Sequence, residues 1–153
     1  MHAIKTKFPY SNILEKFPIK YKQPLNNIVN KEISSYKVLL DAISDSVEDL
    51  VNNIDGKYPR PQEVEDLWAN IQANKIPDKW LKVSFQTART SLADFLVELS
   101  VKLEFWNKLV SKKNILDIES FWLPAFYSPK SFLHSFSQTR SRNESIPIDE
   151  LVL

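Results

Sequence analysis

Two groups of acidic residues stand close enough along the chain to suggest acid–base chemistry. The first is Asp45, Glu48 and Asp49, and the second is Glu63, Glu65 and Asp66. General acid–base catalysis needs carboxyl groups that a pocket holds in different environments. Both groups fall on faces predicted to be solvated, and the second begins a predicted helix, where negative charge stabilises the helix dipole. We therefore favour a solvated surface over a catalytic pair.

The sequence gives even less support for catalysis or metal binding by histidine or cysteine. The two histidines are His2 and His134, and neither has a second ligand at the spacing of a metal site. His134 stands among Phe132, Leu133 and Phe136, so we interpret it as a half-exposed helix residue. The absence of cysteine excludes disulfides, thiolate zinc sites and a cysteine nucleophile. We predict no catalytic, cofactor-binding or metal-binding residue, and no cofactor.

The glycine content excludes the common nucleotide-binding motifs. Phosphate-binding loops, dinucleotide fingerprints and nucleophile elbows each need several glycines at fixed spacing, because the backbone must approach a ligand closely or take positive φ. The chain has one glycine and nine prolines. None of these motifs can therefore be present.

Net charge and hydropathy argue against nucleic-acid and membrane partners. The formal net charge is +1, and the basic sites, such as Lys112/Lys113 and Arg140/Arg142, are small and scattered. No apolar run approaches the roughly 20 residues that a membrane span needs, and the first ten residues lack the apolar core of a secretory signal. We expect a cytoplasmic protein that binds neither nucleic acid nor membrane.

The clearest structural signal is a long amphipathic helix at about 24–55. Apolar residues recur there in steps of three and four, from Leu25 to Ile54, while residues such as Glu32 and Asp45 lie mostly off that stripe. Pro24 suits a first helical turn, and Gly56 stands where a helix ends on a residue able to take positive φ. At about 1.5 Å per residue, such a helix would be about 45 Å long.

The remaining elements indicate a mainly α fold in which two or three shorter helices pack with the long one. We predict helices at about 62–73, 91–111 and 129–138, with Ser91 as an N-cap and Ser128-Pro129 as a helix start. Short apolar runs suggest strands near 121–127 and 146–153. Residues 1–23 form a predicted extended arm, and 24–153 a single helical domain.

Aromatic residues are abundant for a domain of this size. The chain has four Trp, nine Phe and five Tyr. Each is most simply a core or interface anchor, and a buried one contributes a few kcal/mol. Their number exceeds what one small domain needs, which favours a docking module.

In order, these elements resemble the C-terminal region of dynein heavy chains, after the sixth AAA+ module, and most closely the axonemal type. The resemblance extends from about Phe8 onward, and no single motif is strong. Four stretches carry it. The first is Lys16-Phe17-Pro18-Ile19-Lys20-Tyr21 followed by Pro24-Leu25-Asn26-Asn27-Ile28-Val29, and the second is Glu32-Ile33-Ser34-Ser35-Tyr36-Lys37-Val38-Leu39-Leu40 with Ile43 and Ser46-Val47-Glu48-Asp49-Leu50. The third is Ile76-Pro77-Asp78-Lys79-Trp80, and the fourth is Phe121-Trp122-Leu123 with Phe126-Tyr127, Pro129, Phe132-Leu133 and the closing Ile146-Pro147-Ile148-Asp149.

The sequence departs from the family at its glycines. Lys57-Tyr58-Pro59-Arg60-Pro61 replaces a small, aliphatic run, Pro124-Ala125 replaces Ser-Gly, and His134-Ser135 replaces Thr-Gly. Most heavy chains also continue past Ile-Pro-Ile-Asp into a β-rich cap. These differences suggest a divergent and truncated copy, either a fragment of a longer motor or a stand-alone protein.

The resemblance implies a mechanical role without catalysis. In the family, this region packs on the AAA+ ring, while ATP hydrolysis and microtubule binding are carried elsewhere on the heavy chain. The expected partners are therefore AAA+ ring modules, with other dynein subunits and microtubules reached only indirectly, at the cytoskeleton or in the ciliary axoneme. The residues we expect to matter for docking or structure are Tyr36, Leu40, Gly56, Trp80, Trp122, Phe126 and Phe132.

A second hypothesis from another class is a free-standing helical adaptor. In that case the aromatic face would bind a partner protein without any motor role. Docking onto a dynein ring that lacks this segment distinguishes the first hypothesis from the second. A small hydrolase ranks third, because no nucleophile–base pair is visible.

Overall fold

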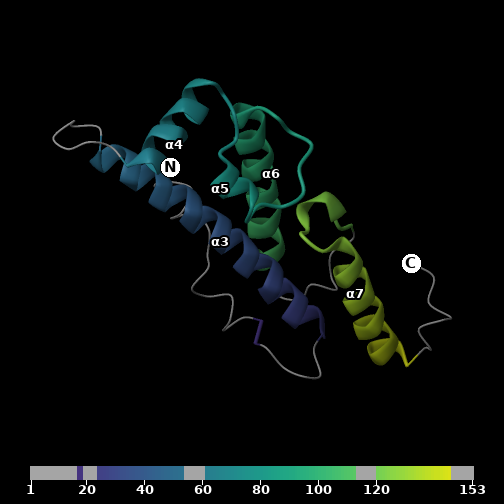
Figure 1. Cartoon of the computed structure of the whole chain (residues 1–153). Helices are drawn as coiled ribbons and strands as arrows, with labels where there is room; N and C mark the ends of the chain where they lie inside the picture. Colours follow the sequence, from purple (N-terminus) through teal and green to yellow (C-terminus); the bar gives the residue numbers. More distant parts are fainter. Residues whose placement is uncertain (1–16, 19–23, 54–60, 113–119, 146–153) are drawn as a thin grey trace. The chain divides into compact units, whose positions relative to one another are not determined.

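The computed structural model describes residues 17–18, 24–53, 61–112 and 120–145 (Figure 1). Within these ranges the protein is mainly α-helical, which confirms the predicted fold class. The elements are α3 (Pro24–Asn52), α4 (Gln62–Gln72), α5 (Asp78–Leu81), α6 (Leu92–Ser111), the 3-10 turn η3 (Leu123–Ala125) and α7 (Pro129–Glu144). The described residues contain no strand, and an isolated bridge joins Lys75 to Ser91.

The long helix α3 follows from its apolar stripe. Its 29 residues bury Leu25, Ile33, Tyr36, Leu39 and Ile43 almost completely. The side chain of Val51, which the stripe would include, is 58% exposed. Gly56, proposed to end this helix, lies outside the described residues.

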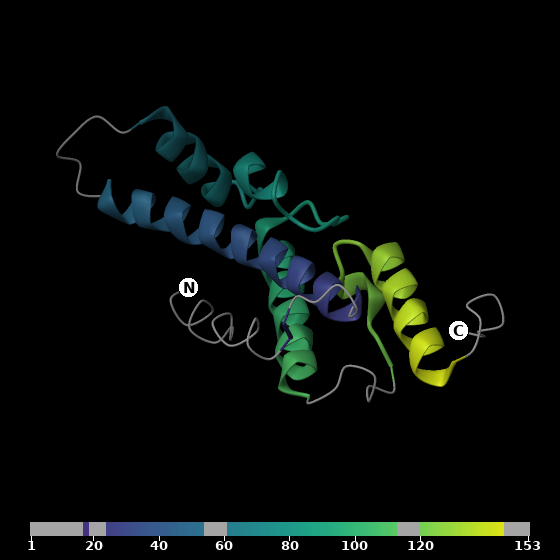
Figure 2. The ribbon, with the colours of Figure 1, turned by 90° about the horizontal axis from the view of Figure 1, so that it is seen from below.

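The described residues divide into two compact units, and α3 and α6 each contribute to both. The first unit takes residues 35–53 and 61–105, and the second takes 17–18, 24–34, 106–112 and 120–145. In the first unit, α4 and α5 lie beside α3, and α6 crosses it (Figure 1 and Figure 2). Its core contains the aromatic series Tyr36, Phe85 and Phe95, with ring centroids 6.1 Å and 5.5 Å apart.

The second unit has an aromatic core of its own. The rings of Trp106 and Phe126 lie 4.9 Å apart in an edge arrangement, and those of Phe126 and Phe132 lie 4.2 Å apart. All three side chains are at most 4% exposed. The Trp106 Nε1–H donates to the Ala125 carbonyl at 3.1 Å, so the one polar group of the indole is satisfied.

Of the two predicted helix starts at Ser91 and Ser128, one has the expected capping hydrogen bond and the other does not. The Ser91 Oγ accepts a hydrogen bond from the Asp94 N–H at 3.1 Å, which confirms the predicted cap of α6. Ser128 is the N-cap residue of α7 and Pro129 its first residue, but the Ser128 side chain makes no capping hydrogen bond. Its backbone N–H is held instead by the carboxylate of Glu32.

Two sequence-based expectations were wrong at the C-terminal side. The predicted strand near 121–127 is a 3-10 turn, because Pro124 cannot donate to a strand ladder and the Ala125 carbonyl is used by Trp106. Helix α7 also continues past 138 to Glu144, since no glycine or proline interrupts it and Arg140 pairs with Glu144 at 2.9 Å. The second predicted strand, near 146–153, lies outside the described residues, as does most of the 1–23 arm.

Candidate functional site

The first candidate is a cleft in the first unit, built around Trp80. Helix α5 begins directly after Pro77 and places the Trp80 side chain in the core, where it is 2% exposed. Its Nε1–H donates to the Ser46 Oγ of α3 at 3.2 Å, and the Ser46 hydroxyl donates to the Ala42 carbonyl at 2.6 Å. This series of hydrogen bonds fixes the indole against α3.

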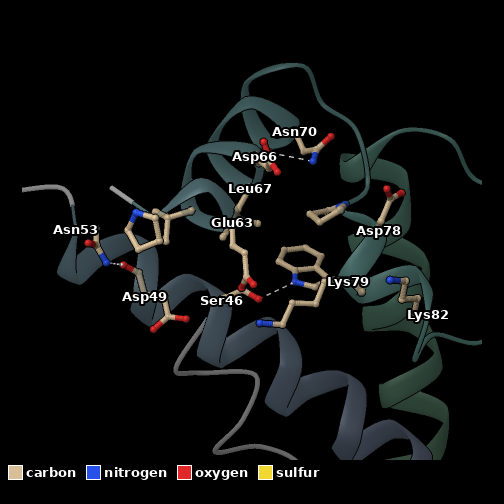
Figure 3. Close-up of a pocket in the computed structure, with 14 residues that line it drawn as sticks. Ser46, Asp49, Asn53, Glu63, Asp66, Leu67, Asn70, Asp78, Lys79 and Lys82 are labelled. Atoms are coloured by element: carbon tan, nitrogen blue, oxygen red, sulfur yellow. Dashed lines mark hydrogen bonds between the residues drawn. The ribbon is translucent and has the colours of Figure 1, made fainter. Parts of the chain in front are cut away.

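The cleft beside this tryptophan has a volume of about 540 Å³ (Figure 3). We call it the Trp80 cleft. Its walls come from α3, from α4 and from the segment 77–82. The lining residues are Ser46, Asp49, Asn53, Pro61, Glu63, Val64, Asp66, Leu67, Asn70, Pro77, Asp78, Lys79, Trp80 and Lys82.

The Trp80 cleft brings together members of both acidic groups of the sequence. Asp49 comes from the first group, and Glu63 and Asp66 come from the second. All three side chains are exposed, so they share a solvated environment, and nothing separates a general acid from a general base. Among the described residues, no three His, Cys, Asp or Glu side chains gather in a way that could hold a metal ion. The geometry favours binding over chemistry.

His134 lies on an exposed part of α7, away from any cluster of ligands within the described residues. Its Nε2 is 2.9 Å from the Gln138 Nε2, one turn further along the same helix. His2 lies outside the described residues.

A buried lysine in the first unit escaped the sequence-based reasoning. Lys102 of α6 is 2% exposed, and its Nζ lies 3.0 Å from the Glu98 Oε1 and 3.7 Å from the centre of the Phe85 ring. Burial lowers the pKa of Lys102, against the opposing effect of Glu98. Burial alone would raise the pKa of Glu98, but hydrogen bonds from Lys102 and Thr87 outweigh it and lower that pKa. Lys102 and Glu98 therefore form an ion pair within α6, and the Thr87 hydroxyl, which donates to the Glu98 Oε2 at 2.8 Å, ties the segment before α6 to that helix.

A buried carboxylate in the second unit was also missed. Glu32 was expected off the apolar stripe of α3, yet it is 1% exposed. Its two oxygens accept hydrogen bonds from the backbone N–H groups of Tyr127 at 2.6 Å and Ser128 at 2.9 Å, at the start of α7. Burial raises the pKa of Glu32, and the two backbone hydrogen bonds only partly offset that rise.

Glu32, Ser46 and Lys102 share a sequence signal that could have revealed them. Glu32 stands three residues after Val29 and four before Tyr36, and Ser46 stands between Ile43 and Leu50 at the same spacings. Lys102 lies between Leu99 and Trp106 in the same way. Each is a polar residue at a position of the apolar stripe, where helical geometry forces burial.

Comparison with known proteins accounts for all 153 residues. The family described as the C-terminal domain of the dynein heavy chain matches residues 1–153. The protein belongs to this family.

The similar curated proteins are axonemal dynein heavy chains. This dynein C-terminal domain is 26% identical over 151 residues to dynein axonemal heavy chain 3 of Mus musculus. The alignment covers 99% of the domain but only 4% of the length of that heavy chain. The domain is 25% identical over 154 residues to dynein axonemal heavy chain 12 of Homo sapiens, with 99% of the domain and 5% of the relative aligned. The domain thus spans only about a twentieth of the relatives it matches. No solved structure matches it significantly.

The residues expected to dock the dynein C-terminal domain fall into two classes. Five are buried among the domain's own residues, at 9% exposure or less, namely Tyr36, Leu40, Trp80, Phe126 and Phe132. Trp122 is 38% exposed, and Gly56 is outside the described residues. The structure brings Phe126 and Phe132 together but places Tyr36 and Trp80 in the other unit. Of the described members of the set, only Trp122 offers a large accessible surface to a partner.

None of the helices in the described ranges is both long enough and apolar enough to cross a lipid bilayer.

Proposed function

We propose that this protein is a non-catalytic structural segment of a dynein heavy chain, which packs on the AAA+ motor ring and contributes to microtubule-based motility. The observation that carries this proposal is the match of all 153 residues to the C-terminal domain of dynein heavy chains. The similarity to axonemal heavy chains supports a place at the cytoskeleton, in the ciliary axoneme. Nucleotide hydrolysis and microtubule binding would then belong to other parts of the heavy chain.

The fold supports a mechanical role. A 29-residue helix is about 43 Å long, and its burial along most of one side makes it a stiff element. Such an element can transmit displacement between ring modules, which we propose as the partners in cis. Other dynein subunits and microtubules would be reached only indirectly, and we propose neither a nucleic-acid nor a membrane partner.

A reconstituted motor tests this proposal. The probe is the heavy chain of the similar axonemal relative without its C-terminal domain, to which the 153-residue domain is added in trans. We expect the domain to bind the ring and to change its ATPase rate or its microtubule gliding velocity. The absence of both binding and any effect on the motor would contradict the proposal and favour the adaptor hypothesis.

Trp122 provides a sharper version of this test. Trp122 and Trp68 are both 38% exposed, but only Trp122 belongs to the residues proposed to dock. We expect Trp122→Ala to weaken binding to the ring, and Trp68→Ala to serve as a matched control with little effect. Equal effects of the two variants would argue against docking through Trp122.

A further inference from the structure

We propose that the Trp80 cleft binds a peptide segment that carries lysine or arginine and belongs to the rest of the heavy chain. This inference rests on the proposed function, because it names a contact through which the domain would be held. The cleft has a volume of about 540 Å³, within the range of binding pockets. It lies wholly within the first unit.

The charge of the Trp80 cleft selects a basic partner. Four carboxylate side chains line it, those of Asp49, Glu63, Asp66 and Asp78, against two lysine side chains. Figure 3 shows that Asp49 comes from one helix and Glu63 and Asp66 from another, on neighbouring walls, while both lysines come from the segment 77–82. The lining of the cleft as a whole therefore carries more acidic than basic side chains.

The acidic side chains of this lining are available to a partner. Among the described residues, neither the Asp49 nor the Glu63 carboxylate makes an ion pair. The Asp66 carboxylate accepts a hydrogen bond from the neutral amide of Gln62 at 2.8 Å. By contrast, Glu98 and Glu144 already pair with cations of their own helices. A cationic side chain entering the cleft would find more negative than positive charge, because the two lysines of the lining are outnumbered by four carboxylates.

The floor of the cleft is rigid and partly apolar. Val64, Leu67 and Trp80 are each at most 8% exposed, and the hydrogen bond from Trp80 to Ser46 fixes the indole. Pro61 and Pro77 also line the cleft, and their rings restrict the backbone there. A preformed cleft of this kind loses little entropy when it binds, and the apolar stem of a lysine or arginine can lie against its floor.

The source of the segment follows from the length of the relatives. The domain spans only 4% of dynein axonemal heavy chain 3 of Mus musculus, so most of such a heavy chain lies outside it. A covalently connected segment acts at a high effective concentration, so even a modest charge interaction can be occupied in cis. Exposed ion pairs are individually weak, which suits a contact of this type.

The test compares two triple variants that each remove three negative charges in total from α3 and α4. The first, Asp49→Asn/Glu63→Gln/Asp66→Asn, neutralises the cleft. The second, Asp45→Asn/Glu48→Gln/Glu65→Gln, neutralises three exposed residues of α3 and α4 that do not line it. Each variant removes one acidic residue from the first turn of α4, so their effects on the helix dipole are matched.

The probes are fluorescent peptides that tile the motor part of dynein axonemal heavy chain 3 of Mus musculus, measured by polarisation with the 153-residue domain. We expect a subset of Lys/Arg-bearing peptides to bind, less tightly as salt rises. The cleft variant should weaken this binding about tenfold, because each exposed ion pair accounts for roughly a 1.4- to 5-fold change in affinity. The matched control should change it less than about twofold, and circular dichroism should show that both variants remain helical.

Two outcomes of the peptide experiment would overturn the proposal. These are the absence of any basic peptide that binds, and equal weakening by the two triple variants. Binding of the domain to the motor ring with full strength in the cleft variant would also overturn it, while the proposed function would stand. Salt-dependent peptide binding without any binding to the ring would instead contradict the proposed function and leave the chemistry of the cleft established.

Discussion

The buried carboxylate of Glu32 makes the sharpest prediction about stability. Glu32→Ala removes the acceptor of two backbone N–H groups at the start of α7. Each buried donor left without a partner costs about 1–3 kcal/mol. Loss of the desolvated carboxylate offsets part of this cost, so we expect the free energy of unfolding to fall by about 2–4 kcal/mol. Glu32→Gln keeps one acceptor oxygen and should lose about 1–2 kcal/mol.

The pH dependence of this effect has a definite sign. The pKa of Glu32 is raised above its ordinary value of 4.5, so the folded protein retains its proton at pH values where the unfolded protein has released it. The contribution of Glu32 to stability is therefore fully present below pH 4.5 and decreases as the pH rises through the raised pKa. Glu32→Gln has no such titration, so its deficit relative to the natural protein should be smaller at pH 7 than at pH 4.

Equilibrium urea unfolding of the 153-residue domain, followed by circular dichroism at several pH values, measures both quantities. Glu48→Gln, an exposed carboxyl of the same helix, is the control and should change the free energy of unfolding by less than about 0.5 kcal/mol. A deficit of Glu32→Gln that grows from pH 4 to pH 7 would refute the reasoning. It would mean that the two N–H donors outweigh desolvation and lower the pKa.

Five further substitutions probe the hydrogen bond between Trp80 and Ser46, the ion pair of Glu98 with Lys102, and the aromatic core of the second unit. Trp80→Phe and Ser46→Ala each remove the hydrogen bond between these two side chains, so each should lower the free energy of unfolding by about 1–2 kcal/mol. The double variant should lose less than the sum of the two, because the same hydrogen bond is removed only once. Glu98→Gln should cost about 3 kcal/mol, since it removes the negative charge that lies 3.0 Å from the buried Lys102 ammonium. Lys102→Met should cost less, because Glu98 is 20% exposed, and the reverse order in urea unfolding would contradict this. Phe132→Ala should cost about 3–5 kcal/mol in thermal or urea unfolding, because its ring is fully buried among Phe121, Phe126 and Phe136. A loss below about 1 kcal/mol would argue against that core.

Periodicity predicted the helical elements because their signals are local. The apolar stripe that starts at Leu25, the cap at Ser91 and the Ser128-Pro129 start are all contained within a few residues of sequence. The corresponding helices begin at Pro24, Leu92 and Pro129. The failure at 121–127 has the same origin, because an apolar run does not reveal whether a partner strand exists. Here the run supplies Phe126 to an aromatic core instead.

The candidate site could be predicted far less well, because it depends on contacts between distant segments. Ser46 and Trp80 are 34 residues apart in the sequence, and Glu32 and Ser128 are 96 apart. The acidic groups were recognised as solvated, and Asp49, Glu63 and Asp66 are exposed, but only the packing of α4 on α3 places them around one cleft. Composition indicated aromatic anchors without indicating which of them remain accessible. Trp122 is exposed and Phe132 is buried, and only tertiary packing decides this difference in exposure.

Buried polar contacts give the long helix a definite register that its apolar stripe alone would not supply. Apolar packing is non-directional, so a neighbour displaced by one turn along α3 would bury a similar area. The hydrogen bonds are directional: Glu32 holds the start of α7 in the second unit, and Ser46 holds Trp80 in the first. A displaced neighbour would leave a buried carboxylate or an indole N–H without a partner, at a cost of about 1–3 kcal/mol for each neutral donor and more for the charge. For a segment proposed to transmit displacement, such fixed points matter more than the net stability they add, because a helix whose neighbours could slip would not transmit movement.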